Sequence, residues 1–148
     1  MTKRIICILF IVSLSIFSSQ ADELFLSLKK SKVFVRYGPS FESDIKYVYR
    51  KINLPIKQID KKENFRRIVD FEKNSGWIHI SQLKNNTSVI STDLKILFKK
   101  PSSFAKPIAQ LKKGRLLIVK ECKKKWCSVE TGKFTGWVDK ENLWGISK

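Results

Sequence analysis

A segment with the same internal spacing occurs twice in this 148-residue chain, and this repeat limits the possible folds more than any other feature. In each occurrence a Gly-Trp pair precedes an aliphatic residue, and a leucine lies six residues after the tryptophan. The two tryptophans, Trp77 and Trp137, lie about 60 residues apart. A repeat of this length indicates two copies of one small folding unit.

The pattern within each copy predicts strands. Beyond the N-terminal segment, short apolar runs alternate with polar residues and are separated by Pro, Gly, Asn and Lys, while no stretch keeps a helical period. We therefore expect an all-β chain with about five short strands per copy. The expected domains are 22–84 and 93–148, joined by a polar linker over 85–92. Copies this small bury little surface, so the two should pack together.

The apolar positions of the second copy give a candidate core. Alternation along its strands places seven side chains inward, namely Leu94, Ile96, Ile108, Leu116, Ile118, Val129 and Val138.

The first 21 residues have the pattern of a signal peptide. Lys3 and Arg4 precede an apolar stretch over 5–17, and small residues at Ser19 and Ala21 come just before an acidic pair. A membrane anchor is the alternative, but this stretch is shorter than the roughly 20 residues that a bilayer requires. We expect cleavage after Ala21 and an exported, periplasmic or secreted protein.

Export changes the interpretation of two cysteines. Cys122 and Cys127 are separated by four residues, and in an oxidising compartment we expect a disulfide across a hairpin rather than free thiols. A metal site would need further Cys or His nearby, and the single histidine, His79, lies in the other copy. We predict neither a metal nor another cofactor.

The residues that catalysis would need are scarce. Neither cysteine has a histidine in its own copy to act as a base. Four acidic residues of the first copy flank predicted turns, where we expect them to be solvated rather than paired in a cleft: Asp60, Glu63, Asp70 and Glu72. The sequence therefore predicts a protein that is not an enzyme, with no catalytic residues.

The formal charge of +17 favours an anionic partner or surface. The basic residues are mainly lysines clustered at predicted turns, which suits diffuse attraction and allows peripheral electrostatic contact with a membrane. A compositional bias without any ligand is the alternative. Nucleic acid is not expected as a partner because the chain is exported.

Four aromatic residues form a candidate ligand-binding groove. Tyr37, Phe41, Tyr47 and Trp77 lie in or near the first copy's long loop, where they could hold an extended peptide. The alternative is that these rings belong to the core and to packing between the copies.

Three stretches carry a resemblance to a known family. Residues 33–40 (VFVRYGPS) resemble the opening strand and loop of bacterial Src-homology-3 domains. Residues 65–71 with 76–79, and the run from Cys122 to Gly145, resemble the two copies of an exported family with tandem domains of this kind. This sequence has Phe65 where a tryptophan is usual, and Lys123 to Lys125 in place of a glycine-containing turn.

The resemblance implies two small, partly open Src-homology-3-like barrels in tandem, a module used to bind cell-wall peptides or other proteins. It carries over no catalytic residue. We therefore expect a non-enzymatic module that holds a cell-envelope ligand: a peptidoglycan peptide, an anionic polymer or an envelope protein. One alternative is a structural adaptor in an envelope complex. The other is an accessory part of a cell-wall hydrolase, or the hydrolase itself.

Overall fold

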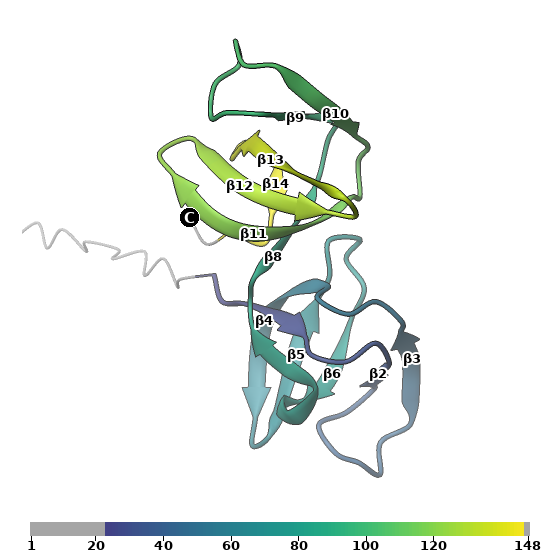
Figure 1. The fold of residues 1–148 in the computed structure, drawn as a ribbon. Coiled ribbons are helices and arrows are strands. Elements are labelled where there is room, and N and C mark those ends of the chain that lie inside the picture. Colours follow the sequence, from purple (N-terminus) through teal and green to yellow (C-terminus); the bar gives the residue numbers. More distant parts are fainter. Residues whose placement is uncertain (1–22, 147–148) are drawn as a thin grey trace, which may run out of the picture.

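The computed structural model describes residues 23–146, which form two antiparallel sheets of seven strands each (Figure 1). The all-β architecture in two copies is confirmed, and the described residues contain no α-helix. We call the unit built on the first sheet the first copy and the other the second copy. The first copy contains β1 (Phe25–Leu28), β2 (Val33–Arg36), β3 (Ile45–Tyr49), β4 (Pro55–Lys62), β5 (Phe65–Val69), β6 (Ser75–His79), the 3-10 turn η1 (Ile80–Gln82) and β7 (Leu83–Asn85). The second copy contains β8 (Ser88–Ser91), β9 (Lys95–Phe98), β10 (Pro107–Leu111), β11 (Leu116–Lys123), β12 (Trp126–Thr131), β13 (Phe134–Asp139) and β14 (Leu143–Trp144).

The two copies have the same topology. The strand order is β3-β2-β6-β5-β4-β1-β7 in the first sheet and β10-β9-β13-β12-β11-β8-β14 in the second, so each strand has a counterpart seven places later. The long strands β4 and β11 each shift register, at 58–60 and at 119–121. Bulges of this kind bend a strand and strengthen its twist, which lets a sheet curl toward a partly open barrel.

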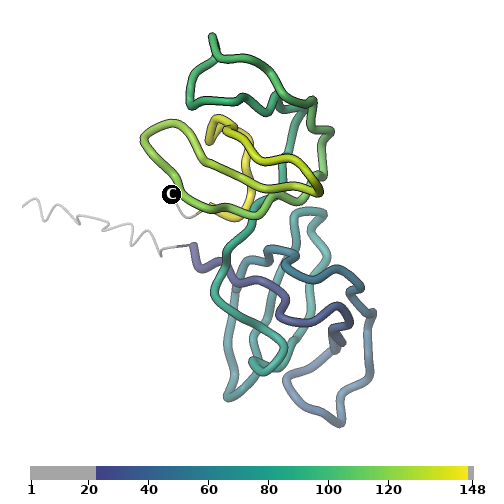
Figure 2. Tube along the Cα trace, in the orientation of Figure 1, coloured from purple at the N-terminus to yellow at the C-terminus, as the bar shows by residue number. Residues whose placement is uncertain are grey.

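The expected linker is wrong in its central part, because residues 88–91 form β8. This strand pairs with β11 and β14, as β1 pairs with β4 and β7, and all four of its side chains are buried. The polar composition around 84–92 hid a strand of only four residues. Figure 2 shows the chain passing from the first copy into the second along the segment that leads into β8.

Each copy has its own hydrophobic core. Ile68 and Ile78 are central to the first, and Leu97, Leu117 and Val129 to the second. The expected core of the second copy is right for Val129 and Val138, which are fully buried. It is wrong for the other five: Leu94 and Ile108 are exposed, and Ile96, Leu116 and Ile118 are only half-buried.

The error in β9 and β11 is a shift by one residue, which moves every side chain of a strand to the opposite face. Their runs are nearly all apolar, so alternation could not choose a face. In β11, Leu117 enters the core of the second copy, whereas Leu116 packs against the core of the first. Ile90 of β8 also belongs to that first core. One strand thus serves two hydrophobic clusters.

Hydrogen bonds and rings also join the copies. The Ser27 hydroxyl donates to Asn86 Oδ1 (2.5 Å) and lies 3.1 Å from the Ser88 hydroxyl. The Asn86 amide donates to the carbonyl oxygen of Gly145 (2.7 Å). The rings of Phe25 and Trp144 meet edge to face, with centroids 5.0 Å apart. Strands β1, β8 and β14 therefore meet at a single interface.

The glycine of each Gly-Trp pair lies where two strands approach closely. A Cβ at Gly136 would be 2.6 Å from the carbonyl oxygen of Phe98, and one at Gly76 would be 2.4 Å from Cγ1 of Val35. Real Cβ atoms essentially never make contacts this short. The repeated motif thus has a packing reason in both copies.

The disulfide between Cys122 and Cys127 is confirmed, with an S–S distance of 2.00 Å. It links directly opposed residues of β11 and β12, next to the tight turn of that hairpin. Cys127 is fully buried and forms part of the second core. The bridge therefore holds the lysine-rich turn against the core.

The expected signal peptide lies outside the described residues. Nowhere from residue 23 to residue 146 does the chain form a helix with the length and hydropathy that crossing a bilayer requires.

Candidate ligand-binding surface

The outer face of strands β2, β6 and β5 carries the most concentrated group of functional side chains. Arg36, Trp77 and Arg67 are consecutive partners across these strands. Their neighbours Val35, Ile68 and Ile78 are fully buried. Because successive side chains of a strand point to opposite faces, Trp77 and both arginines project away from the core. Trp77 therefore occupies the middle position of a row of three residues on this face, with an arginine on each neighbouring strand.

Three rings form a cluster at the end of the same face. Phe65 and His79 are paired residues of β5 and β6, and their ring centroids are 5.1 Å apart. Phe41, in the loop between β2 and β3, lies 5.2 Å from Phe65 and 4.9 Å from His79. Phe65 is buried beneath this arrangement, whereas Phe41 remains 59% exposed. The cluster therefore offers one open aromatic ring on a packed base.

Arg36 holds the loop that carries Phe41. Its Nη1 donates hydrogen bonds to the carbonyl oxygens of Phe41 (2.9 Å) and Ser43 (2.7 Å). Its guanidinium carbon also lies 5.7 Å from the centroid of the Phe41 ring. A ring that is already held in place loses little conformational freedom when a ligand binds to it. We call Phe41, Phe65, His79, Arg36 and Trp77 the outer aromatic face.

The four aromatic residues singled out in the sequence do not form one groove. Phe41 and Trp77 belong to the outer aromatic face, linked through Arg36. Tyr37 is exposed beyond the end of β2, and the Lys46 ammonium lies 5.6 Å from its ring centroid. Tyr47 pairs with the buried Val35 and packs against the first core, so it faces the opposite side of the sheet.

Sequence reasoning missed Arg36, Phe65 and His79 as members of this face. The spacing of Trp77 and His79 by two residues does predict that they share one side of a strand. The sequence does not predict which strands lie beside it, because β2 and β6 are far apart in the chain.

Two tyrosines and an aspartate form a network on the core side of β3. The hydroxyls of Tyr47 and Tyr49 are 3.3 Å apart, and the Tyr49 hydroxyl donates to Asp70 Oδ2 (2.8 Å). Burial raises the pKa of Tyr49 far above its usual value, and the hydrogen bonds to Tyr47 and Asp70 raise it further. Burial also raises the pKa of Tyr47. This network is a structural element, with both hydroxyls kept protonated.

Replacing Tyr49 with phenylalanine should make the free energy of unfolding less sensitive to alkaline pH. Above pH about 10 the unfolded chain releases the Tyr49 proton while the folded chain keeps it. The free energy of unfolding is therefore unaffected by this group below that pH and decreases as the pH rises above it. Allowing for partial solvent exposure of Tyr49, the decrease should be about 1 kcal/mol per pH unit. Urea unfolding from about pH 8 to about pH 11 should show the shallower slope in the variant. Equal slopes would contradict the assignment.

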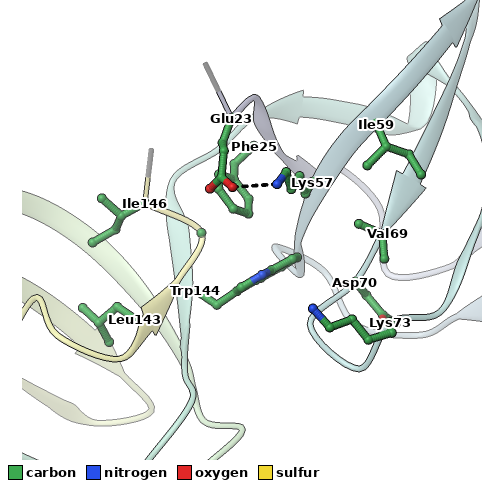
Figure 3. Close-up of a pocket in the computed structure, with 11 residues that line it drawn as sticks. Glu23, Phe25, Lys57, Ile59, Val69, Asp70, Lys73, Leu143, Trp144 and Ile146 are labelled. Carbon is green, nitrogen blue, oxygen red and sulfur yellow. Dashed lines mark hydrogen bonds and ion pairs between the residues drawn. The ribbon is translucent and has the colours of Figure 1, made fainter. Parts of the chain in front are cut away.

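A cavity of about 330 Å³ lies between the two copies (Figure 3). The Trp144 indole extends along it from the second copy, and Phe25 and Lys57 face it from the first. The Lys57 ammonium is ion-paired with Glu23 (2.6 Å). On the other side, Asp70 already accepts hydrogen bonds from Tyr49 and from the side-chain and backbone nitrogens of Asn74.

The charges that line this cavity balance. Lys57 and Lys73 oppose Glu23 and Asp70, so the cavity has no net preference for an anion or a cation. No sequence signal could have found it, since its residues come from both copies. Within residues 23–146, no group of three or more His, Cys, Asp or Glu side chains is arranged to hold a metal ion. The outer aromatic face is the stronger candidate for ligand binding.

Comparison with known proteins gives one family. The family model described as bacterial SH3 domain matches the chain twice in tandem, at residues 29–85 and 92–145. Together these matches cover most of the chain and place one domain in each copy. A search of curated proteins finds no match.

Two solved structures are similar in part. NlpC2 from Trichomonas vaginalis is 11% identical with a TM-score of 0.38, and the match covers 82% of this chain and 47% of that one. NlpC1 from the same organism is 13% identical with a TM-score of 0.37, covering 91% of this chain and 50% of that one. The chain thus spans about half the length of these two structures.

Proposed function

We propose that this chain, which belongs to the bacterial SH3 domain family, is an exported, non-enzymatic module that holds a cell-envelope ligand on its outer aromatic face. The observation that carries the proposal is the Phe41 ring, exposed yet held in place by Phe65, His79 and Arg36. Aromatic and arginine side chains of this kind dominate the binding energy of protein surfaces.

The ligand that fits this face is an extended peptide of the cell wall. Phe41 and Trp77 present flat apolar surface for its aliphatic groups, while Arg36 and Arg67 supply positive charge for its carboxylates. The many exposed lysines add a diffuse attraction that salt screens. An anionic polymer or an envelope protein would engage the lysines more than the rings.

Retention on purified cell wall tests this proposal. The chain from residue 22 onward should be retained at low salt and, more weakly, at high salt, since contacts of the rings are not screened. Replacing Phe41 with alanine should lower the apparent affinity at both salt concentrations by about tenfold. Bound and free protein are quantified after sedimentation of the wall.

The matched control is Phe134→Ala, which removes a partly exposed ring from β13 of the other copy and should leave retention unchanged. If the protein is retained neither at low salt nor at high salt, wall binding is refuted. Retention that persists in full in Phe41→Ala would place the binding site elsewhere.

A further inference from the structure

Phe104 is the most exposed large apolar side chain among the described residues. It lies in the loop between β9 and β10 and is 99% exposed. Its counterpart in the first copy, Phe41, contacts two rings and a guanidinium group. Among residues 23–146, no ring contact or cation–ring contact includes Phe104.

The second copy lacks the two rings that contact Phe41 in the first copy, so Phe104 has no equivalent partners. The positions of Phe65 and His79 are taken by Trp126 and Asp139, as the matching strand register shows. The Trp126 ring meets Phe98 instead, with centroids 5.7 Å apart. Phe104 is therefore left in water, where an apolar ring gains free energy from any apolar environment it can enter.

The loop itself is held in shape. The Lys99 amide donates to the carbonyl oxygen of Lys106 (2.9 Å), and the Ala105 amide donates to that of Ser102 (3.1 Å). The Phe104 amide donates to the Ser102 hydroxyl (3.2 Å). Figure 1 places this loop at the end of the second copy that is remote from the first. The ring thus projects from an ordered tip with free access to a large surface.

Positive charge surrounds this ring. Lys99, Lys100 and Lys106 are exposed and line a shallow hollow with Phe104. No ion pair found within residues 23–146 includes any of these three lysines. No acidic residue occurs between Asp93 and Glu121, whereas the equivalent loop of the first copy contains Glu42 and Asp44.

We propose that this tip, Phe104 with Lys99, Lys100 and Lys106, docks on the surface of an anionic lipid bilayer. The ring enters the boundary between headgroups and acyl chains while the ammonium groups stay among the anionic headgroups. A soluble polyanion would satisfy the lysines equally well, but it offers no apolar phase for the ring. The charge complementarity and the unpartnered ring together select the bilayer.

Vesicle binding tests the proposal. The chain from residue 22 onward, which contains every described residue and lacks the apolar N-terminal stretch, is sedimented with vesicles of phosphatidylcholine and phosphatidylglycerol. It should bind these and not phosphatidylcholine alone. Phe104→Ala should lower the partition coefficient by about tenfold or more. Replacing Lys99 and Lys100 with glutamine should lower it by about fivefold per lysine.

Three controls separate insertion from diffuse attraction. Phe134→Ala removes a partly exposed ring from β13 of the same copy and should bind vesicles like the original protein. Binding to soluble polyphosphate should weaken in the lysine variant and stay unchanged in Phe104→Ala. A Phe104→Trp variant should shift its emission to shorter wavelength when anionic vesicles are added.

The opposing results are equally definite. Vesicle binding that Phe104→Ala leaves unchanged would mean attraction by charge alone and would overturn the proposal. So would a Phe104→Trp variant whose emission does not change although the protein sediments with vesicles. Absence of binding to anionic vesicles would overturn it directly. Because Phe104 is almost fully exposed, these variants should keep the melting temperature of the original protein, which shows that the fold is intact.

Discussion

Replacing Gly136 with alanine is expected to lower the free energy of unfolding of the second copy by about 3 kcal/mol. The added methyl group would lie 2.6 Å from the carbonyl oxygen of Phe98 and 2.8 Å from Cγ of Leu97. Phe98 belongs to the adjacent strand β9, so relief requires the two strands to move apart. Urea unfolding followed by the fluorescence of Trp126, Trp137 and Trp144 measures the change.

The equivalent change in the first copy should cost less. At Gly76 the shortest contact of a new Cβ would be with Cγ1 of Val35, a side-chain atom that can shift, and the contact with the Arg36 carbonyl oxygen is longer, at 3.0 Å. Thr135→Ala, next to Gly136 but exposed, is the control and should change stability by less than about 0.5 kcal/mol. A Gly136→Ala protein as stable as the original would show that the strands tolerate a wider separation.

Replacing Asp139 with asparagine should also destabilise the second copy, by about 2 kcal/mol, because solvent at the 39% exposed carboxylate compensates part of the loss. Lys95 is only 5% exposed, in the position that the buried Val33 occupies in the first copy, and its ammonium is ion-paired with Asp139. Removing the partner leaves a buried charge uncompensated, which costs far more than an intact pair contributes. Asparagine keeps the oxygen that accepts the Glu141 amide hydrogen bond, so the change isolates the charge.

A second substitution distinguishes this cause from a loss of local structure. Lys95→Met together with Asp139→Asn should recover most of the stability, because an apolar side chain of similar length suits the buried site. Both proteins are compared by the same urea unfolding measurement. A cost below about 1 kcal/mol for Asp139→Asn alone would mean that the Lys95 ammonium reaches water without its partner.

The parts of the fold that the sequence predicted correctly share one property: each depends on residues close together in the chain. The two Gly-Trp pairs indicated the repeat, and the spacing of Cys122 and Cys127 predicted the hairpin disulfide. Short apolar runs between turn residues predicted the all-β class. Local patterns of this kind arise from backbone propensity and period, which require no knowledge of distant neighbours.

The errors arose where two distant segments had to be paired. Leu116 and Leu117 are adjacent apolar residues, and only the position of the first copy determines that Leu116 lies at the interface. β8 looked like a linker because its short sequence gains stability from β11 and β14 rather than from itself. Tyr47 was grouped with Phe41 because the two are near in sequence, although they lie on opposite sides of the sheet.

The sequence by itself determined that this protein is two copies of a small β domain. It also determined that a disulfide links the two strands of a hairpin in the second copy, and that positive charge is concentrated at the turns. Only the tertiary structure decided which face of each strand became core, that Arg36, Phe65 and His79 join Phe41 on the outer aromatic face, and that Phe104 is left without a partner. The reason is that a strand's period of two fixes which residues share a face, whereas the strands and copies packed against it decide which face is buried.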